Sequence, residues 1–359
     1  MPCQKKTRVA VLFGGVSSEH EISLLSVESV LANLPDKYEV LRIGITKDGR
    51  WVEYTGKNDE ITSQKWEHDP TLRTAIVSPD RANKGVLLLS NAGWELVPVD
   101  ICFPVLHGKH GEDGTIQGLF QLAGIPFVGC NMISSANCMD KEMTHTILEA
   151  HGIKMAKWTI VNQEKMEHFE EFAREAEEKL GYPMFVKPAN AGSSVGVGKA
   201  HNREQLLAAC QTALKEDYKA VVEECIEMQE VETAVLGNAH PQAAGVVGEL
   251  VPVVEFYTYE AKYIDGTTEL HIPGRVSEET SRKLRQTAEK AFAAIGCEGF
   301  ARIDFFVRKG DGEVILNEIN TIPGFTSISM YPKLWDYCGV QYPELLDRLI
   351  QLGLQRGEN

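Results

Sequence analysis

The sequence lacks the features typical of membrane, secreted and nucleic-acid-binding proteins. It has no apolar run long enough to cross a bilayer, and we expect no secretory signal because Gly14 and Gly15 interrupt its first apolar stretch. Basic residues are scarce: 36 Lys and Arg stand against 51 Asp and Glu, so the formal net charge is −15. Nucleic acid and anionic membrane surfaces are bound through clustered Lys and Arg, so neither is an expected partner.

Closely spaced cysteine pairs are absent as well. None of the eight cysteines belongs to a C-x-x-C pair, which excludes the usual spacing of a zinc ribbon or a thioredoxin site. Most of them stand among apolar residues, where a free cysteine behaves as a small hydrophobe. We therefore expect reduced, buried thiols and a cytoplasmic protein. The cysteines are Cys3, Cys102, Cys130, Cys138, Cys210, Cys225, Cys297 and Cys338.

Two common nucleotide-binding motifs are also missing. No G-K-[ST] follows a glycine-rich stretch, and the first β–α turn reads "GGVSSE" in place of G-x-G-x-x-G. This disfavours a dinucleotide-binding Rossmann enzyme. With 359 residues, 43% of them hydrophobic, the chain is long enough for two or three globular domains, and no repeat or low-complexity linker separates them. We expect tightly packed domains with binding sites between them.

The first part of the chain has the pattern of a β–α–β unit. A helix is predicted to begin near Ser18, which forms an S-x-x-E capping box with Glu21, and a later helix is predicted to end at Gly124. Strands alternating with helices predict a parallel sheet, in a first α/β domain covering residues 1–129. The predicted strands cover residues 8–15, 38–46 and 99–108.

The rest of the chain divides into two further parts. Residues 130–220 combine helices with short strands and predict a small α+β domain. Residues 221–359 alternate strands with long loops, contain a hairpin at 301–320 and end in a helix. The predicted fold class is therefore α/β followed by α+β.

The hairpin carries the sharpest chemical signal. Asp304 lies in its first strand, and Glu318 and Asn320 lie in its second, all among hydrophobic neighbours. Carboxylate and amide oxygens at this spacing suit a hard cation such as Mg²⁺ held together with phosphate oxygens. The alternative is a solvated edge hairpin with surface acids.

The face on which these side chains lie depends on the length of the hairpin turn. A three-residue loop at 310–312 would place Lys309 opposite Glu313 and therefore Asp304 opposite Glu318. A loop of even length would place Asp304 on the opposite face of the sheet from Glu318. The metal-site prediction therefore assumes the three-residue loop.

A second signal is the glycine-rich stretch at 187–198. Backbone N–H groups in such a loop can cradle phosphates, and Lys187 at the end of a strand supplies a cation. A plain tight hairpin is equally consistent with the pattern.

Two further segments lie where the carboxyl ends of parallel strands are expected. "HGKHGEDG", residues 107–114, has no helical spacing of His107 and His110, so substrate contact is favoured over metal ligation. Glu19 at the start of the first helix is either a group that interacts with the helix dipole or a ligand for an ammonium group. The sequence leaves both interpretations open.

Two loops complete the set of candidate segments. Residues 255–276 are aromatic and polar without a clear period, which fits either a lid or an ordinary surface loop. Residues 321–332 offer glycine and serine donors that suit a carboxylate.

Taken together, these motifs resemble the D-alanine–D-alanine ligase family of the ATP-grasp superfamily. The resemblance covers nearly the whole chain, and the motifs occur in the family's order. They are "GGVSSEHEIS", "FPVLHGKHGEDGTIQG", "SSANCMDK", "VKPANAGSSVGV", "YEAKY", "ARIDFF" and "LNEINTIPGFTSISMYP".

The resemblance implies three domains, with ATP bound between the central and C-terminal ones. It implies two Mg²⁺ ions, with Mn²⁺ as an alternative, on Asp304, Glu318 and Asn320. The residues that it places on the nucleotide are Lys141 and Lys187 at the phosphates, Lys262 in the lid, and Glu223 and Glu230 at the adenine and ribose. The chain departs from the family at Met228, where glycine is frequent.

The resemblance also assigns residues to the amino-acid substrates. Glu19, Ser193 and Tyr263 match a hydrogen-bonded trio that joins the first helix, the glycine-rich loop and the lid. The oxyanion site matches Arg302 and the N–H of Gly324. The pocket for the second substrate's carboxylate matches Ser329 and Met330, with His107 nearby. Ile328 stands where some members have His.

The implied reaction joins two D-alanines through an acyl phosphate, for peptidoglycan precursor synthesis. Tyr263 stands where ligases that make D-Ala–D-lactate often have a different residue, so an amine is the expected nucleophile. A D-Ala–D-Ser ligase is the alternative, because an apolar pocket rejects an added hydroxyl only modestly. Another ATP-grasp amino-acid ligase would share Lys187 and the metal ligands, but not "GGVSSEHEIS" with "YEAKY". The family also implies a homodimer.

A non-enzymatic nucleotide-binding module is the rival from a different class. Such a protein would be expected to have lost Arg302 or one of the metal ligands, and the sequence retains all of them. An enzyme is therefore the favoured interpretation.

Overall fold

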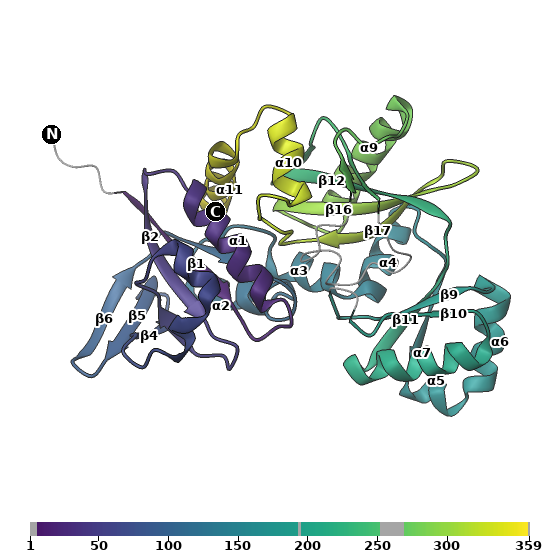
Figure 1. The fold of residues 1–359 in the computed structure, drawn as a ribbon, viewed down its shortest axis with the longest axis horizontal. Coiled ribbons are helices and arrows are strands. Elements are labelled where there is room, and N and C mark those ends of the chain that lie inside the picture. The colour runs from purple at the N-terminus through teal and green to yellow at the C-terminus, as the bar shows by residue number, and fades with distance from the viewer. Residues whose placement is uncertain (1–5, 193–194, 252–268, 358–359) are drawn as a thin grey trace.

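The computed structural model describes residues 6–192, 195–251 and 269–357. It contains three sheets, which are well separated in Figure 1: one at the left, one at the lower right and one at the upper right. No helix among the described residues is both long enough and apolar enough to cross a membrane.

The first sheet has seven strands in the order β6-β5-β4-β3-β2-β1-β7. β1 is parallel to both β2 and β7, as the sequence predicts, whereas β3 to β6 join antiparallel. The strands are β1 (Thr7–Gly14), β2 (Tyr38–Ile45), β3 (Trp51–Glu53), β4 (Thr74–Val77), β5 (Gly85–Ser90), β6 (Gly93–Pro98) and β7 (Ile101–Val105).

The central strand β1 is buried on both faces. Val9, Val11 and Phe13 belong to one hydrophobic core, and Ala10 and Leu12 to the core on the other side. This alternation explains why the segment is a continuous apolar run, since a parallel strand covered on both sides needs hydrophobic residues at every position. Helices α1 (His20–Asn33) and α2 (Thr115–Ala123) follow β1 and β7, and Gly124 ends α2 in the left-handed conformation, as predicted.

The predicted capping box at the start of α1 is wrong. The N-cap is Glu19, and its side chain makes no capping hydrogen bond. Instead, Ser17 Oγ accepts a hydrogen bond from the Glu19 N–H at 3.0 Å and donates to the His107 carbonyl at 2.7 Å. The helix start is thus tied to the loop after β7, a long-range contact that a local capping pattern cannot reveal.

Two 3₁₀ helices, η1 (Asn58–Ser63) and η2 (Lys65–His68), lie between β3 and β4.

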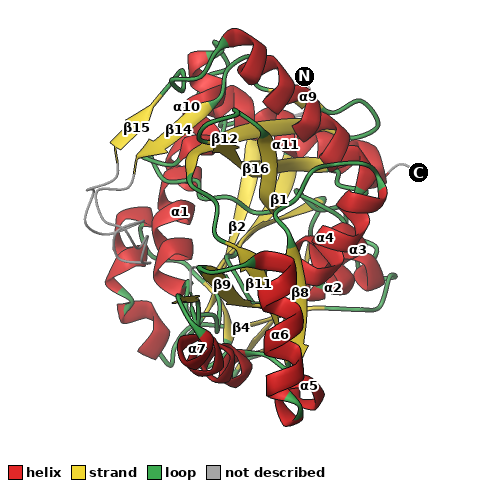
Figure 2. Ribbon diagram, turned by 90° about the vertical axis from the view of Figure 1, so that its right-hand side faces the viewer, coloured by secondary structure: helices red, strands yellow, loops and turns green. Residues whose placement is uncertain are grey.

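The second sheet has four strands in the order β10-β9-β11-β8, and α6 and α7 pack against it (Figure 2). β11 pairs with both β8 and β9, so the domain boundary predicted between residues 220 and 221 lies within a strand of this sheet. The elements are β8 (Trp158–Asn162), α5 (Gln163–Glu167), α6 (Phe169–Leu180), β9 (Met184–Pro188), β10 (Gly198–Ala200), α7 (Arg203–Glu216) and β11 (Lys219–Glu224).

The third sheet follows the order β15-β14-β12-β16-β17, with β13 paired to β12. Helices α3 (Met132–Met139) and α4 (Lys141–Ala150) lie near it, because Cys138 and Leu148 share the core of its strands and of α9. The remaining elements are β12 (Met228–Gly237), β13 (Gln242–Ala243), β14 (Gly248–Val251), β15 (Glu269–His271), α9 (Glu278–Ala294), β16 (Gly299–Arg308), β17 (Val314–Asn320), α10 (Met330–Tyr337) and α11 (Tyr342–Gly357).

The two C-terminal helices join the first and third sheets. Leu334 of α10 and Leu345 of α11 belong to the same core as Val9 and Val27 of the first sheet and α1. The Tyr38 hydroxyl donates a hydrogen bond to Asp347 on α11. The carboxyl ends of β1 and β7 are therefore held against the third sheet, which places the candidate site between them.

The hairpin of β16 and β17 reaches the predicted pairing by a different route. Val307 pairs with Val314, and the Arg308 N–H donates to the Glu313 carbonyl at 2.9 Å, so the turn has four residues and Lys309 does not face Glu313. A register shift between Asp304 and Phe305 then restores the pairing of Asp304 with Glu318. The predicted three-residue turn is wrong. A four-residue turn alone would place Asp304 and Glu318 on opposite faces of the sheet, and the extra residue of a β-bulge returns them to the same face.

Candidate functional site

A cavity lies where the three sheets meet. Its walls come from the start of α1, the β7–α2 loop, α3 and α4, the glycine-rich loop and the end of β17. It brings together four of the predicted site residues: Glu19, Lys141, Glu318 and Asn320. The other lining residues are Glu112, Cys138, Met139, Thr144, His145, Ala191, Gly192, Asn317, Ile319 and Thr321.

The predicted metal ligands lie together on the hairpin. The Asn320 side-chain amide donates to Asp304 Oδ2 at 2.9 Å and lies 3.4 Å from Glu318 Oε1. Asp304 is almost completely buried. Arg302 makes a bidentate ion pair with it, Nε to Oδ1 at 2.7 Å and NH2 to Oδ2 at 2.7 Å.

This donor set fits a magnesium ion that arrives with a nucleotide. The described residues contain no ready-made cluster of three His, Cys, Asp or Glu side chains for a metal ion. Mg²⁺ usually takes one or two carboxylates plus substrate phosphates rather than an all-protein cage, and Asp304 and Glu318 supply two carboxylates at one place. A half-turn of the Asn320 amide would present its oxygen to the same ion.

Two of the predicted nucleotide cations, Lys187 and Lys141, lie near Glu223. Lys187 Nζ is 2.6 Å from Glu223 Oε2, and His145 Nε2 donates to the other oxygen of Glu223 at 2.9 Å. Burial would raise the pKa of Glu223, but the charge of Lys187 and the hydrogen bond from His145 hold it well below its ordinary value. Burial would likewise lower the pKa of Lys187, and Glu223 raises it above its ordinary value.

Lys141 lies in the same region, and no carboxylate among the described residues forms an ion pair with it. Its Nζ donates to the Ala191 carbonyl of the glycine-rich loop at 2.7 Å. Burial lowers its pKa, and the nearby charge of Lys187 acts in the same direction while Glu318 opposes it. Two lysines held close together by the fold form a place where an anion would be stabilised. Glu230, the other predicted nucleotide residue, lies near the start of β12, opposite Phe306 of β16.

Glu19 reaches the glycine-rich loop across the cavity. A Cβ built on Gly192 would lie 2.8 Å from Glu19 Oε2, and one on Gly108 only 2.3 Å from it, so the carboxylate fits closely between two glycines. The sequence predicts that Glu19 meets Ser193 and Tyr263. Those two residues, together with Lys262, lie outside the described residues.

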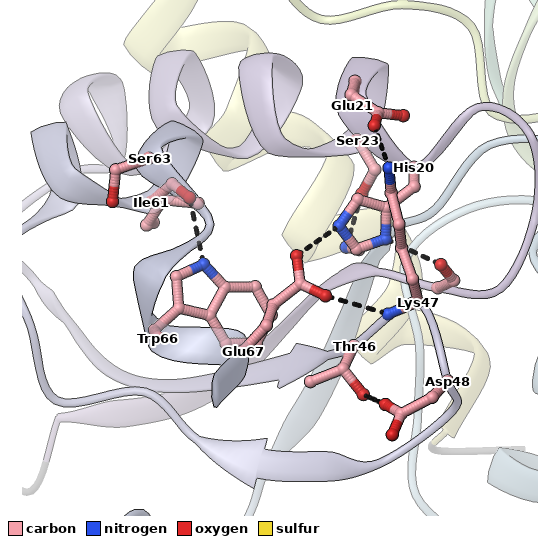
Figure 3. Close-up of polar contacts among 12 residues, drawn as sticks. His20, Glu21, Ser23, Thr46, Lys47, Asp48, Ile61, Ser63, Trp66 and Glu67 are labelled. Atoms are coloured by element: carbon pink, nitrogen blue, oxygen red, sulfur yellow. Dashed lines mark hydrogen bonds and ion pairs between the residues drawn. The ribbon is translucent and has the colours of Figure 1, made fainter. Parts of the chain in front are cut away.

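A buried network fixes the first turn of α1 behind Glu19 (Figure 3). His20 Nδ1 donates to the Gly15 carbonyl at 2.7 Å, and its Nε2 lies 3.1 Å from Glu67 Oε1. The other oxygen of Glu67 accepts from the Lys47 N–H at 3.0 Å, and Lys47 also pairs with Glu21. The sequence analysis did not single out His20 or Glu67, because their contact spans a long sequence separation.

Glu112 is a further site residue that the sequence analysis missed. It belongs to the "HGKHGEDG" segment, in which the sequence pattern points only to the two histidines. Its Oε2 accepts from the Gly108 N–H at 2.8 Å and its Oε1 from the Ile322 N–H at 3.0 Å, so it ties the β7–α2 loop to the segment after β17. Burial, together with the negative charge of Glu19, raises the pKa of Glu112 to about 8.

His107 supports the same segment. Its Nδ1 donates to the Ile322 carbonyl at 2.9 Å, and its Nε2 accepts from the Ser26 hydroxyl at 2.9 Å. Burial lowers the pKa of His107, which keeps the ring neutral. Both ring nitrogens have partners within the protein, and the substrate contact of His107 stays a prediction.

The predicted carboxylate pocket surrounds the start of α10. Ser329 is the N-cap, and its side chain makes no capping bond to the first turn. Its hydroxyl accepts from the Thr326 N–H at 3.0 Å. A Cβ on Gly324 would lie 2.7 Å from that hydroxyl, which explains the glycine. The Met330 side chain is buried in the hydrophobic core, so only its backbone is available to a ligand. Helix N-termini of this kind favour anions.

Comparisons with known protein families agree with this geometry. A model of the D-ala D-ala ligase N-terminus matches residues 8–130, and one of the D-ala D-ala ligase C-terminus matches residues 147–351.

Similar full-length proteins include two curated D-alanine–D-alanine ligases. The one from Acetivibrio thermocellus is 49% identical, over 98% of this chain and 96% of that protein. The one from Clostridium acetobutylicum is 48% identical, over 98% and 99% respectively.

Solved structures give the same picture. The VanG D-Ala:D-Ser ligase from Enterococcus faecalis superposes with a TM-score of 0.88 at 40% identity, covering 97% of this chain and 99% of that one. The D-alanine-D-alanine ligase from Coxiella burnetii superposes with a TM-score of 0.85 at 34% identity, covering 98% and 96%.

Proposed function

The chain belongs to the D-alanine–D-alanine ligase family, and on that premise we propose that it joins two D-alanines into D-Ala–D-Ala at the expense of ATP, for peptidoglycan precursor synthesis. The fold is accordingly the ATP-grasp fold. The observation that carries the proposal is that Glu19, Lys141, Glu318 and Asn320 line one cavity. The Arg302–Asp304 pair contacts Asn320, and Lys187 contacts Asn317 of the same lining.

The chemical problem is that a carboxylate is a poor acylating agent. ATP supplies a γ-phosphoryl group that converts the carboxylate of the first D-alanine into an acyl phosphate with a good leaving group. Lys141 and Lys187 would bind the phosphates, and Lys187 would exchange Glu223 for a phosphate oxygen. Glu223 and Glu230 would hold the adenine and ribose, with Lys262 contributed by the lid.

Asp304, Glu318 and Asn320 would hold the metal ions, which we propose to be two Mg²⁺, with Mn²⁺ as a substitute. These ions would neutralise the negative charge of the phosphates. The oxygen-rich donor set on β16 and β17 and the pairing of Asp304 with Glu318 support this assignment.

The amino-acid substrates would lie between the first and third sheets. Glu19, with Ser193 and Tyr263, would hold the ammonium group of the first D-alanine. The deprotonated amine of the second D-alanine would attack the acyl carbon, and Arg302 with the N–H of Gly324 would stabilise the resulting oxyanion. Cleavage of the bond between the acyl carbon and the phosphate oxygen would then release phosphate and leave the peptide bond. Ser329 and the backbone of Met330 would receive the second carboxylate, in a pocket that His107 keeps in position by holding Ile322. Exclusion of water from the site would protect the acyl phosphate from hydrolysis.

D-alanine is the proposed second substrate, and D-serine is the alternative. The curated relatives, at 45–49% identity, are D-alanine–D-alanine ligases, whereas the D-Ala:D-Ser ligase is 40% identical. We also propose a cytoplasmic homodimer, for which sedimentation equilibrium is the test. A monomer at micromolar concentration would contradict it.

The function is tested by measuring ADP release with Mg²⁺-ATP and D-alanine, beside L-alanine, D-serine and D-lactate, and by identifying the products. We expect release that depends on D-alanine, with D-Ala–D-Ala formed. Turnover only with a mixture of D-alanine and D-serine would establish the alternative. A protein that binds ATP but turns over no D-amino acid would contradict both.

A further inference from the structure

Three charged side chains are buried side by side in the third sheet. Glu232 on β12 is the direct cross-strand partner of Asp304 on β16, and Arg302 lies two residues before Asp304 on the same face. The exposed fractions of Glu232, Asp304 and Arg302 are 2%, 1% and 6%. Arg302 Nε lies 3.2 Å from Glu232 Oε2, in addition to its bidentate pair with Asp304. The proposed function gives Glu232 no role.

The two carboxylates face different demands in the proposed reaction. Asp304 is a proposed metal ligand, so its oxygens cannot serve Arg302 and a metal ion equally. A buried guanidinium that loses its partner is strongly disfavoured, and more so beside a metal cation. Glu232 is the second carboxylate within reach of Arg302, and it can keep the guanidinium neutralised and in place when Asp304 turns to the metal.

The strand order separates Glu232 from the metal ligands. β16 lies between β12 and β17, so Glu232 is on one side of Asp304, and Glu318 and Asn320 are on the other. Two strand spacings, about 10 Å of backbone separation, lie between β12 and β17. Glu232 is thus placed to hold Arg302 rather than to complete the metal site.

We propose that Glu232 is a positioning residue: it holds Arg302 at the oxyanion site and thereby releases Asp304 for the metal ion. This inference rests on the proposed roles of Asp304 and Arg302. It goes beyond them in assigning the exchange of partners to a third residue on a neighbouring strand.

The test is metal binding without turnover. Glu232→Gln keeps the shape and an oxygen that can accept from Arg302 Nε, but it removes the charge. Of the two carboxylates described beside Arg302, Asp304 alone then keeps its charge, and a metal ion must compete with Arg302 for it. We expect the dissociation constant of Mn²⁺, measured by electron paramagnetic resonance with a non-hydrolysable ATP analogue, to rise about tenfold, which corresponds to about 1.4 kcal/mol.

Glu249→Gln is the matched control. Glu249 is buried in the same sheet on β14 and pairs with Arg275 at 2.7 Å, away from Arg302. Its loss is expected to lower the melting temperature and to leave Mn²⁺ affinity within twofold of that of the wild type. An equal loss of Mn²⁺ affinity in both variants would overturn the proposal, since it would reflect general weakening of the sheet.

Repeating the substitution in a variant that lacks Arg302 shows whether Glu232 affects Mn²⁺ binding through Arg302 or directly. In Arg302→Gln protein, we expect Glu232→Gln to change Mn²⁺ affinity less than twofold, because the competition for Asp304 is gone. A tenfold loss in that background would mean that Glu232 acts on the metal directly, and would overturn the proposal. Unchanged affinity in the folded single variant would do the same.

The proposed function is tested by a different measurement, the formation of D-Ala–D-Ala. Wild-type protein that binds Mn²⁺ and nucleotide but forms no D-Ala–D-Ala would contradict the function while leaving the partner exchange at Arg302 measurable. Conversely, an active wild type with Mn²⁺ affinity unaffected in Glu232→Gln would retain the function and remove the role of Glu232.

Discussion

Two clusters of charged side chains beside the cavity, here named the first and the second wall, hold charges in opposite proportions. On the third sheet, one guanidinium, Arg302, is shared by Asp304 and Glu232. On the second sheet, one carboxylate, Glu223, is shared by Lys187 and His145. The first wall has an excess of carboxylate and needs a cation, whereas the second has an excess of donors and needs an anion. The imbalance of each cluster thus predicts the charge of its ligand, which we propose to be a metal ion for the first and a phosphate for the second.

The largest expected effect comes from removing the carboxylate excess. We predict that Asp304→Asn lowers kcat/KM about a thousandfold, as expected when a buried charge partner worth roughly 4 kcal/mol is removed. Steady-state kinetics across a Mg²⁺ titration provides the measurement. Asp311→Asn, at the exposed hairpin turn, is the control and should be silent. An Asp304→Asn enzyme of near-normal activity would show that the first wall does not bind the metal.

Removing the cation from the Glu223 cluster should weaken the binding of ATP. Lys187→Met removes the cation and leaves Glu223 with His145 alone, so we expect KM for ATP to rise about a hundredfold, or roughly 2.7 kcal/mol, with a smaller change in kcat. ATP titration at saturating D-alanine measures it, with the exposed Lys309→Met as control. A defect confined to kcat at normal KM would contradict a binding role for the second wall.

The comparison can be sharpened by weakening the second cluster without removing a lysine. His145→Gln keeps a neutral donor for Glu223, so we predict only a threefold to fivefold rise in KM for ATP, about 1 kcal/mol, the size of one neutral hydrogen bond. Isothermal titration with an ATP analogue would detect it. A change as large as that in Lys187→Met would mean that His145, and not the lysine, provides the anion site.

Glu112 shows how a buried carboxyl behaves when backbone N–H groups hold it in place of a cation. Its pKa is raised to about 8, so the folded protein keeps a proton that the unfolded chain has released above its ordinary pKa of 4.5. The free energy of unfolding should therefore fall as pH rises from 5 to 8, by at most about 1.4 kcal/mol per pH unit from this group. Urea unfolding across that range should show a shallower slope in Glu112→Gln. Parallel slopes in the two proteins would exclude the effect.

The sequence predicts the parts of the site that depend on local pattern. The buried run of β1, the strands around the glycine-rich loop, and the grouping of Asp304, Glu318 and Asn320 follow from alternation and spacing. His20, Glu112 and Glu232 could not be found in this way, because each acts through a partner that is distant in sequence or on another strand. The hairpin shows both cases: the pairing of Asp304 is predicted correctly, but from a three-residue turn that the chain does not have.

The bulge in β17 has a consequence for the spacing of the two walls. The register of β16 and β17 passes over Asn317, because Phe305 pairs with Leu316 and Asp304 with Glu318. Glu318 lies opposite Asp304, while Asn317 Oδ1 is 3.5 Å from Lys187 Nζ. One peptide unit, about 3.8 Å between Cα atoms, therefore separates the residue opposite the proposed metal ligand Asp304 from the residue beside the proposed phosphate ligand Lys187. The bulge in one strand thus fixes the distance between the proposed metal site and the proposed phosphate site.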